Sequence, residues 1–222
     1  QRQMCIRDSC VNDYVCWSAP VEDLSEWRYE GVIYRKKQDP KNPLGYHLLF
    51  APDVCQGPDG RYYLYYAFDF LGIMSVAVCD TPAGEYKFLG HIHYADGTLW
   101  GRRRGDQLPF DPGVLADDDG RVWLYSGFYN AVPAILTGGH KLRCDGGTVL
   151  ELEKDMVTIK TEPRVIFPKK GPGAFQGHEF FEASSIRKEG KTYIFVYSSR
   201  HNHELCYATS QSPDRDFSYG GT

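Results

Sequence analysis

Short apolar segments separated by tight-turn signals recur along most of the chain. Residues 51–66, 111–125 and 182–197 share one order of features: a short apolar segment, an Asp-Gly or Glu-Gly pair, and a second segment rich in β-branched and aromatic side chains. An Asp-Gly pair between two such segments signals a β-hairpin, and β-branched and aromatic residues favour strands. The pattern therefore predicts three similar antiparallel hairpins.

A second repeated pair of segments follows two of these hairpins. Residues 75–90 resemble residues 206–220, and both resemble residues 14–31, a copy that has no front half before it. The repeats begin at residues 51, 111 and 182, so successive starts are 60 and 71 residues apart. Four strands per unit at this spacing are typical of the blades of a β-propeller.

The repeat predicts an all-β fold, an incomplete β-propeller of about three and a half blades. Half a blade covers residues 10–34, and three units cover about 51–94, 111–167 and 182–222. The alternative is an antiparallel β-sandwich whose segments resemble one another by coincidence. Because a propeller protects its strand edges by closing, we expect an open arc to expose edges and core.

The first nine residues share no pattern with the rest. Residues 4–9 resemble the translation of a transposase adaptor used to build sequencing libraries. We therefore expect residues 1–9 to be a non-native leader and residues 10–222 to be a partial propeller domain. A genuine but irregular N-terminal tail is the alternative.

Composition supports β structure and argues against several partners. Aromatic residues make up 14% of the 222 residues, and the chain holds 16 Tyr, 23 Gly and 13 Pro. A net charge of −4 offers no electrostatic footprint for nucleic acid or an anionic membrane. Seven cysteines in no zinc or redox spacing indicate reduced core thiols, which suits a cytoplasmic protein, and no metal site is predicted.

Two carboxylates occupy matching places in the repeat. The innermost strand of each blade lines the central channel, so equivalent positions converge on one cavity. The three motifs begin with Ala51, Asp111 and Glu182. Glu182 lies between Phe181 and Ala183, where a charged residue is poorly explained as solvated surface. A pair of carboxylates is what acid/base hydrolysis of a glycosidic bond requires.

The same motifs resemble glycoside hydrolase family 43. The resemblance is carried by Phe-Ala-Pro-Asp-Val at 50–54, Phe-Asp-Pro-Gly-Val at 110–114 and Phe-Phe-Glu-Ala-Ser at 180–184. It covers nearly all of residues 10–222. It implies a five-bladed β-propeller hydrolase that cleaves α-L-arabinofuranosyl or β-D-xylosyl linkages of plant carbohydrates with inversion and needs no organic cofactor. The alternatives are a propeller glycosidase acting on fructans or mannosides and a non-catalytic carbohydrate-binding propeller.

The resemblance also implies roles by position. Glu182 would be the general acid, and Asp111 would raise the pKa of Glu182 and orient it. The general base of the family is an Asp at the opening of the first blade, which no residue here matches, so we expect the fragment to be inactive. Some family members hold calcium in the central channel, commonly near a fifth-blade His that has no counterpart here.

Further residues beside these motifs are candidates for substrate contact. They are Phe50, Asp53, His178, Arg200 and His203. Asp53 has the alternative of capping a turn, and the two histidines and Arg200 have the alternative of being ordinary loop residues. Glu179 is the rival to Glu182 as the acid.

Overall fold

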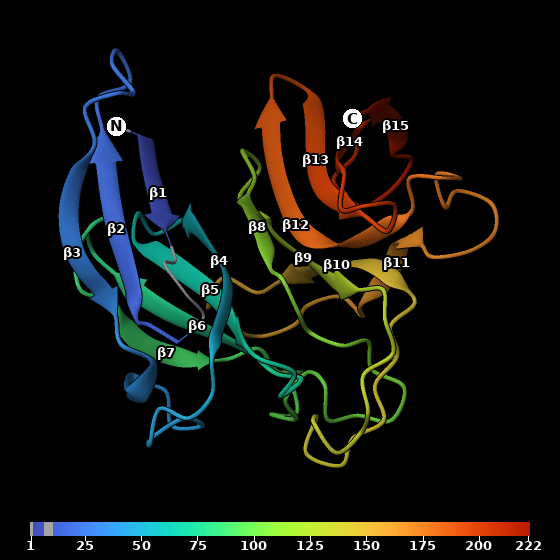
Figure 1. The fold of residues 1–222 in the computed structure, drawn as a ribbon, viewed down its shortest axis with the longest axis horizontal. Coiled ribbons are helices and arrows are strands. Elements are labelled where there is room, and N and C mark those ends of the chain that lie inside the picture. The colour runs from blue at the N-terminus through green and yellow to red at the C-terminus, as the bar shows by residue number, and fades with distance from the viewer. Residues whose placement is uncertain (1, 7–10) are drawn as a thin grey trace.

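The computed structural model describes residues 2–6 and 11–222 of the chain (Figure 1). In these residues the strands form four antiparallel sheets, and within each sheet the strands are neighbours in the order of the sequence. The first sheet consists of β1 (Arg2–Ile6), β2 (Tyr14–Ala19) and β3 (Arg28–Tyr34). A short 3₁₀ helix, η1 (Lys36–Gln38), follows it.

The other three sheets have four strands each. The second contains β4 (Leu49–Gln56), β5 (Tyr62–Phe68), β6 (Met74–Cys79) and β7 (Lys87–His91). The third contains β8 (Gly113–Ala116), β9 (Val122–Phe128), β10 (Gly146–Leu152) and β11 (Arg164–Pro168). The fourth contains β12 (Phe180–Glu189), β13 (Thr192–Ser199), β14 (Leu205–Ser210) and β15 (Ser218–Gly221). These bounds confirm the predicted all-β fold and its blade-like units.

The repeated Asp-Gly pairs form the same turn in two sheets. Gly60 and Gly120 have φ angles of +83° and +80°, which a residue without a Cβ adopts easily. The preceding Asp59 accepts a hydrogen bond from the backbone N–H of Arg61 at 3.1 Å, and Asp119 does the same for Arg121 at 3.0 Å. The local sequence therefore sets the first hairpin of each of these sheets.

The core lies between neighbouring sheets. Tyr65, Trp100 and Leu124 belong to a buried cluster that joins the second and third sheets. Phe167 of β11 and Phe195 of β13, whose rings lie 4.5 Å apart, belong to the cluster that joins the third and fourth sheets. Many of the tyrosines are buried in the second strand of a sheet, as apolar packing between blades requires.

The first strands of the three complete sheets lie toward the middle of the molecule (Figure 1). β8 contacts both β4 and β12. Aspartates link these strands: Asp53 Oδ2 accepts a hydrogen bond from the backbone N–H of Val114 at 2.8 Å, and Asp111 Oδ2 accepts one from the N–H of Ala183 at 2.9 Å. The segments that open each blade are therefore joined to one another.

The N-terminal segment has a place in the first sheet. The backbone of β1 pairs with β2, from Arg2 opposite Ala19 to Ile6 opposite Val15. This strand was not predicted, because residues 1–9 share no pattern with the rest of the chain and were left out of the expected fold. That these residues are a non-native leader stays a prediction.

Two further observations concern the cysteines and the helices of the described residues. Cys55, Cys79, Cys144 and Cys206 are free thiols, and Cys16, Cys144 and Cys206 are buried, as expected for core thiols. Over residues 2–6 and 11–222, no helix has the length and apolar character needed to cross a membrane.

Candidate active site

Glu182 lies at the irregular start of β12. The pairing of β12 with β13 shifts on both sides of Glu182, between Phe180 and Glu182 and between Glu182 and Ser185. The side chain of Glu182 is 27% exposed. Burial raises the pKa of this carboxyl, since a low-dielectric setting disfavours the charged form, and the nearby His203 opposes the shift. The site therefore favours a protonated Glu182.

Among the ion pairs of the described residues, Glu182 takes part in one, with His203. Its Nδ1 lies 3.9 Å from Glu182 Oε1 and 3.2 Å from Ser198 Oγ. Its ring meets Phe181 edge-on, with ring centres 4.7 Å apart. The structure thus places the predicted residue His203 beside the Glu182 carboxyl.

Asp111 is buried beside the Glu182 segment. Its φ of +51° lies in the left-handed region, and its Oδ2 accepts the hydrogen bond from the N–H of Ala183, the residue after Glu182. The Asp111 carboxylate therefore contacts the backbone of the segment that carries Glu182. Burial is the first cause of the raised pKa of Glu182, and the effect of the like charge of Asp111 on that pKa stays a prediction.

The repeat register at this point is corrected by one residue. Ala51, Asp111 and Ala183 share positive φ angles of 42°, 51° and 60°, so these three residues are equivalent in the backbone. Glu182 therefore stands one position before the residue that matches Asp111, and not at the matching position. The pairing with the second strand is irregular here in both β4 and β12, with register shifts between Phe50 and Asp53 and on both sides of Glu182.

An aromatic wall begins at Phe181, next to Glu182, and draws residues from three sheets. Phe181 contacts Phe128, with ring centres 5.4 Å apart, and Phe128 contacts Phe110 at 5.2 Å. Phe110 in turn contacts Phe70 at 5.3 Å and Phe50 at 5.7 Å. Phe110 and Phe128 are buried in this wall, whereas Phe50, Phe70 and Phe181 are partly exposed and offer surfaces that suit the apolar faces of sugar rings.

Sequence reasoning found one end of this wall and missed the rest. Phe50 was a predicted contact, whereas Phe70, Phe128 and Tyr129 were not. Tyr129 stacks against Phe181 with ring centres 6.1 Å apart. Phe70 follows β5, Phe128 ends β9 and Tyr129 follows it, so the signal available in the sequence was an aromatic residue at the end of the second strand of a blade.

Arg200 lies along the same wall. Its guanidinium is 5.2 Å from the centre of the Tyr129 ring, a cation–π contact. Its backbone N–H donates to the carbonyl of Glu179 at 2.9 Å. A positive group in this position can donate hydrogen bonds to sugar hydroxyls.

Asp53 and His178 are engaged with other parts of the protein. Besides Val114, Asp53 accepts a hydrogen bond from the N–H of Val54 at 3.0 Å and lies 3.4 Å from Arg187. Burial raises the pKa of Asp53, against the effect of Arg187. His178 Nδ1 lies 2.9 Å from Glu204 Oε2. Asp53 therefore connects its own strand, β4, to β8 of the neighbouring blade. That Asp53 or His178 contacts substrate stays a prediction.

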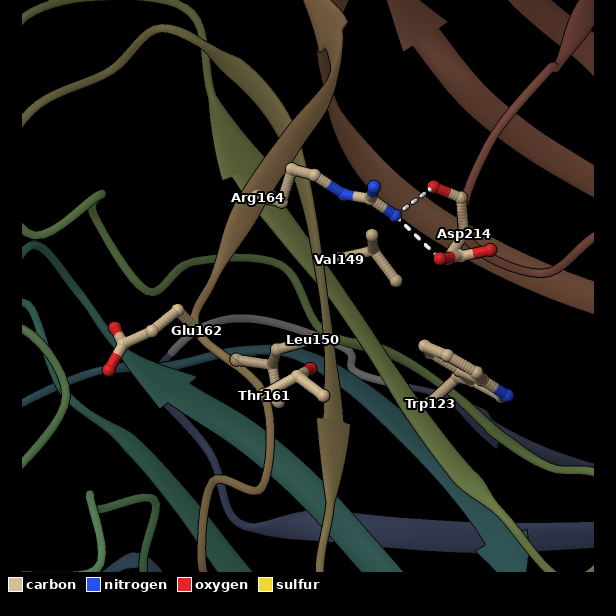
Figure 2. A pocket seen from close by; sticks show the side chains of 7 residues that line it. All are labelled: Trp123, Val149, Leu150, Thr161, Glu162, Arg164 and Asp214. Atoms are coloured by element: carbon tan, nitrogen blue, oxygen red, sulfur yellow. Dashed lines mark hydrogen bonds and ion pairs between the residues drawn. The ribbon is translucent and has the colours of Figure 1, made fainter.

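Three cavities have linings that do not include Glu182. Figure 2 shows one of about 280 Å³ between the third and fourth sheets, crossed at one end by an ion pair of 2.6 Å between Arg164 and Asp214. Its lining consists of Trp123, Val149, Leu150, Thr161, Glu162, Arg164 and Asp214. None of these was a predicted site residue, and two other cavities lie around Arg28 of the first sheet.

Sequence comparison identifies one family. A profile described as glycosyl hydrolases family 43 matches residues 9–219. A "Xylosidase/arabinosidase" of Thermoclostridium stercorarium is 57% identical over 216 residues, which cover 96% of this chain and 44% of the relative. A protein of the same name from Bacteroides ovatus is 30% identical over 232 residues, which cover 95% of this chain and 66% of the relative.

Solved structures have the same architecture. A GH43_1 enzyme from Xanthomonas citri complexed with xylose superposes with a TM-score of 0.69 at 25% identity, covering 95% of this chain and 64% of that one. An alpha-L-arabinofuranosidase from Clostridium thermocellum gives 0.66 at 25% identity, covering 95% and 62%. These matches confirm the β-propeller and exclude the β-sandwich. The chain spans about half to two thirds of the length of these proteins, and it belongs to glycosyl hydrolase family 43.

Proposed function

We propose that the chain forms part of an inverting glycosidase that cleaves α-L-arabinofuranosyl or β-D-xylosyl linkages of plant carbohydrates. The observation that carries the proposal is Glu182, a half-buried carboxyl with a raised pKa at the start of the inner strand β12. Two relatives are named xylosidase/arabinosidase, which supports the choice of sugars.

The chemistry assigned to Glu182 is general acid catalysis. The proton on Glu182 passes to the glycosidic oxygen while the bond between that oxygen and the anomeric carbon breaks. A water molecule attacks the anomeric carbon from the opposite face and gives its proton to a general base, so the product has inverted configuration. Asp111 positions the acid by holding the N–H of Ala183.

The general base has no matching residue in this sequence. We therefore expect the 222-residue chain to leave nitrophenyl arabinosides and xylosides intact, because no group activates the attacking water. Release of an inverted sugar by this chain alone would contradict the proposal that the base is missing.

A chimera allows the acid to be tested in a complete ring. In it, the matching segment of the Thermoclostridium stercorarium relative is replaced by residues 10–222 of this chain, a substitution favoured by the 57% identity. Glu182→Gln keeps the shape but removes the proton, and we expect kcat on xylo-oligosaccharides to fall about 10²–10⁴-fold. The matched control is Glu179→Gln, the rival acid, which should retain most of the activity. The opposite ranking of the two variants would assign the acid to Glu179.

A further inference from the structure

Three side chains with metal-binding atoms gather on the fourth sheet, away from the Glu182 carboxyl. His178 comes from the loop before β12, Glu204 directly precedes β14, and Cys206 is the second residue of β14. One ligand atom of each lies within 4.8 Å of those of the other two. Glu204 and Cys206 are two residues apart, so in extended backbone their side chains point to the same face of the sheet.

The surrounding residues hold two of these side chains in place. The His178 ring stacks on Tyr219 with ring centres 4.7 Å apart and an interplanar angle of 16°. The Tyr197 hydroxyl donates to the His178 carbonyl at 2.8 Å. The Ser199 hydroxyl donates to Glu204 Oε2 at 3.1 Å, the same oxygen that lies 2.9 Å from His178 Nδ1. The imidazole and the carboxylate are thus oriented before any ligand arrives.

Cys206 supplies the third ligand from the core. Its side chain is fully buried and free, and it belongs to the cluster that joins the third and fourth sheets. The Cys206 thiol has side-chain hydrogen bonds to Tyr197 and Tyr219, which hold the sulfur beside the histidine and the carboxylate. The other two groups are partly exposed, which leaves a path from solvent.

We propose that His178, Glu204 and Cys206 bind a divalent transition metal of the zinc type. Imidazole nitrogen, thiolate sulfur and carboxylate oxygen are the ligands of Zn²⁺, whereas Ca²⁺ and Mg²⁺ take oxygen ligands. Three protein ligands leave the fourth tetrahedral position to water. The two negative charges of Glu204 and the Cys206 thiolate balance the ion, and the Cys206 proton is released on binding.

The adjustment that binding requires is small. Tetrahedral Zn²⁺ with bonds of about 2.0–2.1 Å to nitrogen and oxygen and about 2.3 Å to sulfur places the first two atoms about 3.3 Å apart and the sulfur about 3.5 Å from each. His178 Nδ1 and Glu204 Oε2, now 2.9 Å apart, would separate slightly, and the sulfur would move inward from its place within 4.8 Å. Rotation of side chains is enough for both changes.

The site would tie a long loop to the sheet that carries the acid. His178 stands four residues before Glu182, so an ion shared with β14 would fix the loop that leads into β12. Because the ion binds the folded state only, it stabilises that state by mass action. The proposal does not rest on the hydrolytic function.

Cobalt titration of the 222-residue chain tests the site directly. We expect Co²⁺ to produce the near-ultraviolet charge-transfer band of a cobalt–thiolate bond and the visible bands of tetrahedral cobalt, saturating at one ion per chain at micromolar concentration, with Zn²⁺ displacing it. Cys206→Ser should abolish the near-ultraviolet band. His178→Gln, which keeps the thiol, should weaken binding at least tenfold.

The control variant is Cys144→Ser, which removes another buried free thiol and should leave the titration unchanged. Circular dichroism of each variant checks that it is folded, and thermal melting with Zn²⁺ or Ca²⁺ should show a rise in Tm with Zn²⁺ only. A thiolate band that survives Cys206→Ser, an affinity unaffected by His178→Gln in folded protein, or no band in the unsubstituted chain would overturn the proposal.

Discussion

At the scale of single residues, the environment of Glu182 sets its protonation. Burial raises the pKa of Glu182, and His203 lowers it by favouring the carboxylate when the imidazole is charged. A general acid must be protonated, so activity should be present below the pKa of Glu182 and be lost as the pH rises through it. With Glu182 as the proposed acid, the balance between burial and His203 should fix the alkaline limit of activity.

Removal of the histidine should extend this limit. In the chimera, His203→Gln should move the alkaline limb of the kcat/KM profile to higher pH, because the carboxylate loses the cation that stabilises it. His201→Gln, on the same turn, is the matched control and should leave the limb in place. A limb that moves to lower pH, or equally in both variants, would contradict the assigned contact.

A second prediction at the residue scale concerns Asp117, a buried carboxylate that links the third and fourth sheets. Asp117 accepts a hydrogen bond from Tyr193 and pairs with Lys188, and these partners keep its pKa low despite the opposing effect of burial. Tyr193→Phe should lower the free energy of unfolding by about 1–3 kcal/mol, since a buried carboxylate loses a donor. Tyr46→Phe, at an exposed position, should change it by less than about 0.5 kcal/mol.

The measurement is urea denaturation at several pH values. Because the folded-state pKa of Asp117 lies below its ordinary value of 3.8, its contribution to stability is present above that value and is lost as the pH falls through the folded pKa. The difference between the wild-type chain and Tyr193→Phe should therefore shrink in acid. A difference that is constant with pH would mean that the hydroxyl acts without the carboxylate.

At the scale of elements, local turn chemistry made the blades predictable. The Asp-Gly pairs at 59–60 and 119–120 and the aromatic strands after them act over a few residues, so the sequence pattern finds them. The aromatic wall was not predictable in this way, because Phe70, Phe110 and Phe128 meet only when two blades pack. The one-residue offset of Glu182 likewise becomes visible only in the backbone φ angles of Ala51, Asp111 and Ala183.

Asp53 tests whether an aspartate at the opening of a blade serves the fold or the substrate. Asp53→Ala removes the acceptor for Val114 N–H, and we expect it to lower the free energy of unfolding by about 1–3 kcal/mol. In the chimera, KM should stay unchanged, as measured with a nitrophenyl xyloside. A raised KM at unchanged stability would instead support the predicted substrate contact.

At the scale of the whole molecule, the last sheet presents an apolar face to solvent. Leu205 and Tyr207 of β14 point to the same side and are 71% and 40% exposed. In a closed propeller each blade packs against the next, so this face should be covered in the chimera and open in the 222-residue chain.

One substitution should act oppositely in the two proteins. Leu205→Lys should increase the solubility of the 222-residue chain, because it adds charge to an exposed apolar face, and should lower the Tm of the chimera, where it buries a charge. Light scattering and thermal melting measure the two effects. An equal effect of Leu205→Lys on both proteins would contradict the assignment of this face to a blade contact.

The central claim is that Glu182 gives its proton to the leaving group, and the leaving-group dependence of Glu182→Gln in the chimera tests it most directly. Substrates whose leaving groups have a high pKa need that proton, whereas dinitrophenolate departs without it. We predict a loss of about 10²–10⁴-fold in kcat/KM for xylobiose and little loss for dinitrophenyl xyloside, with Glu179→Gln unaffected on both. An equal loss on both substrates would contradict the assignment of Glu182 as the general acid.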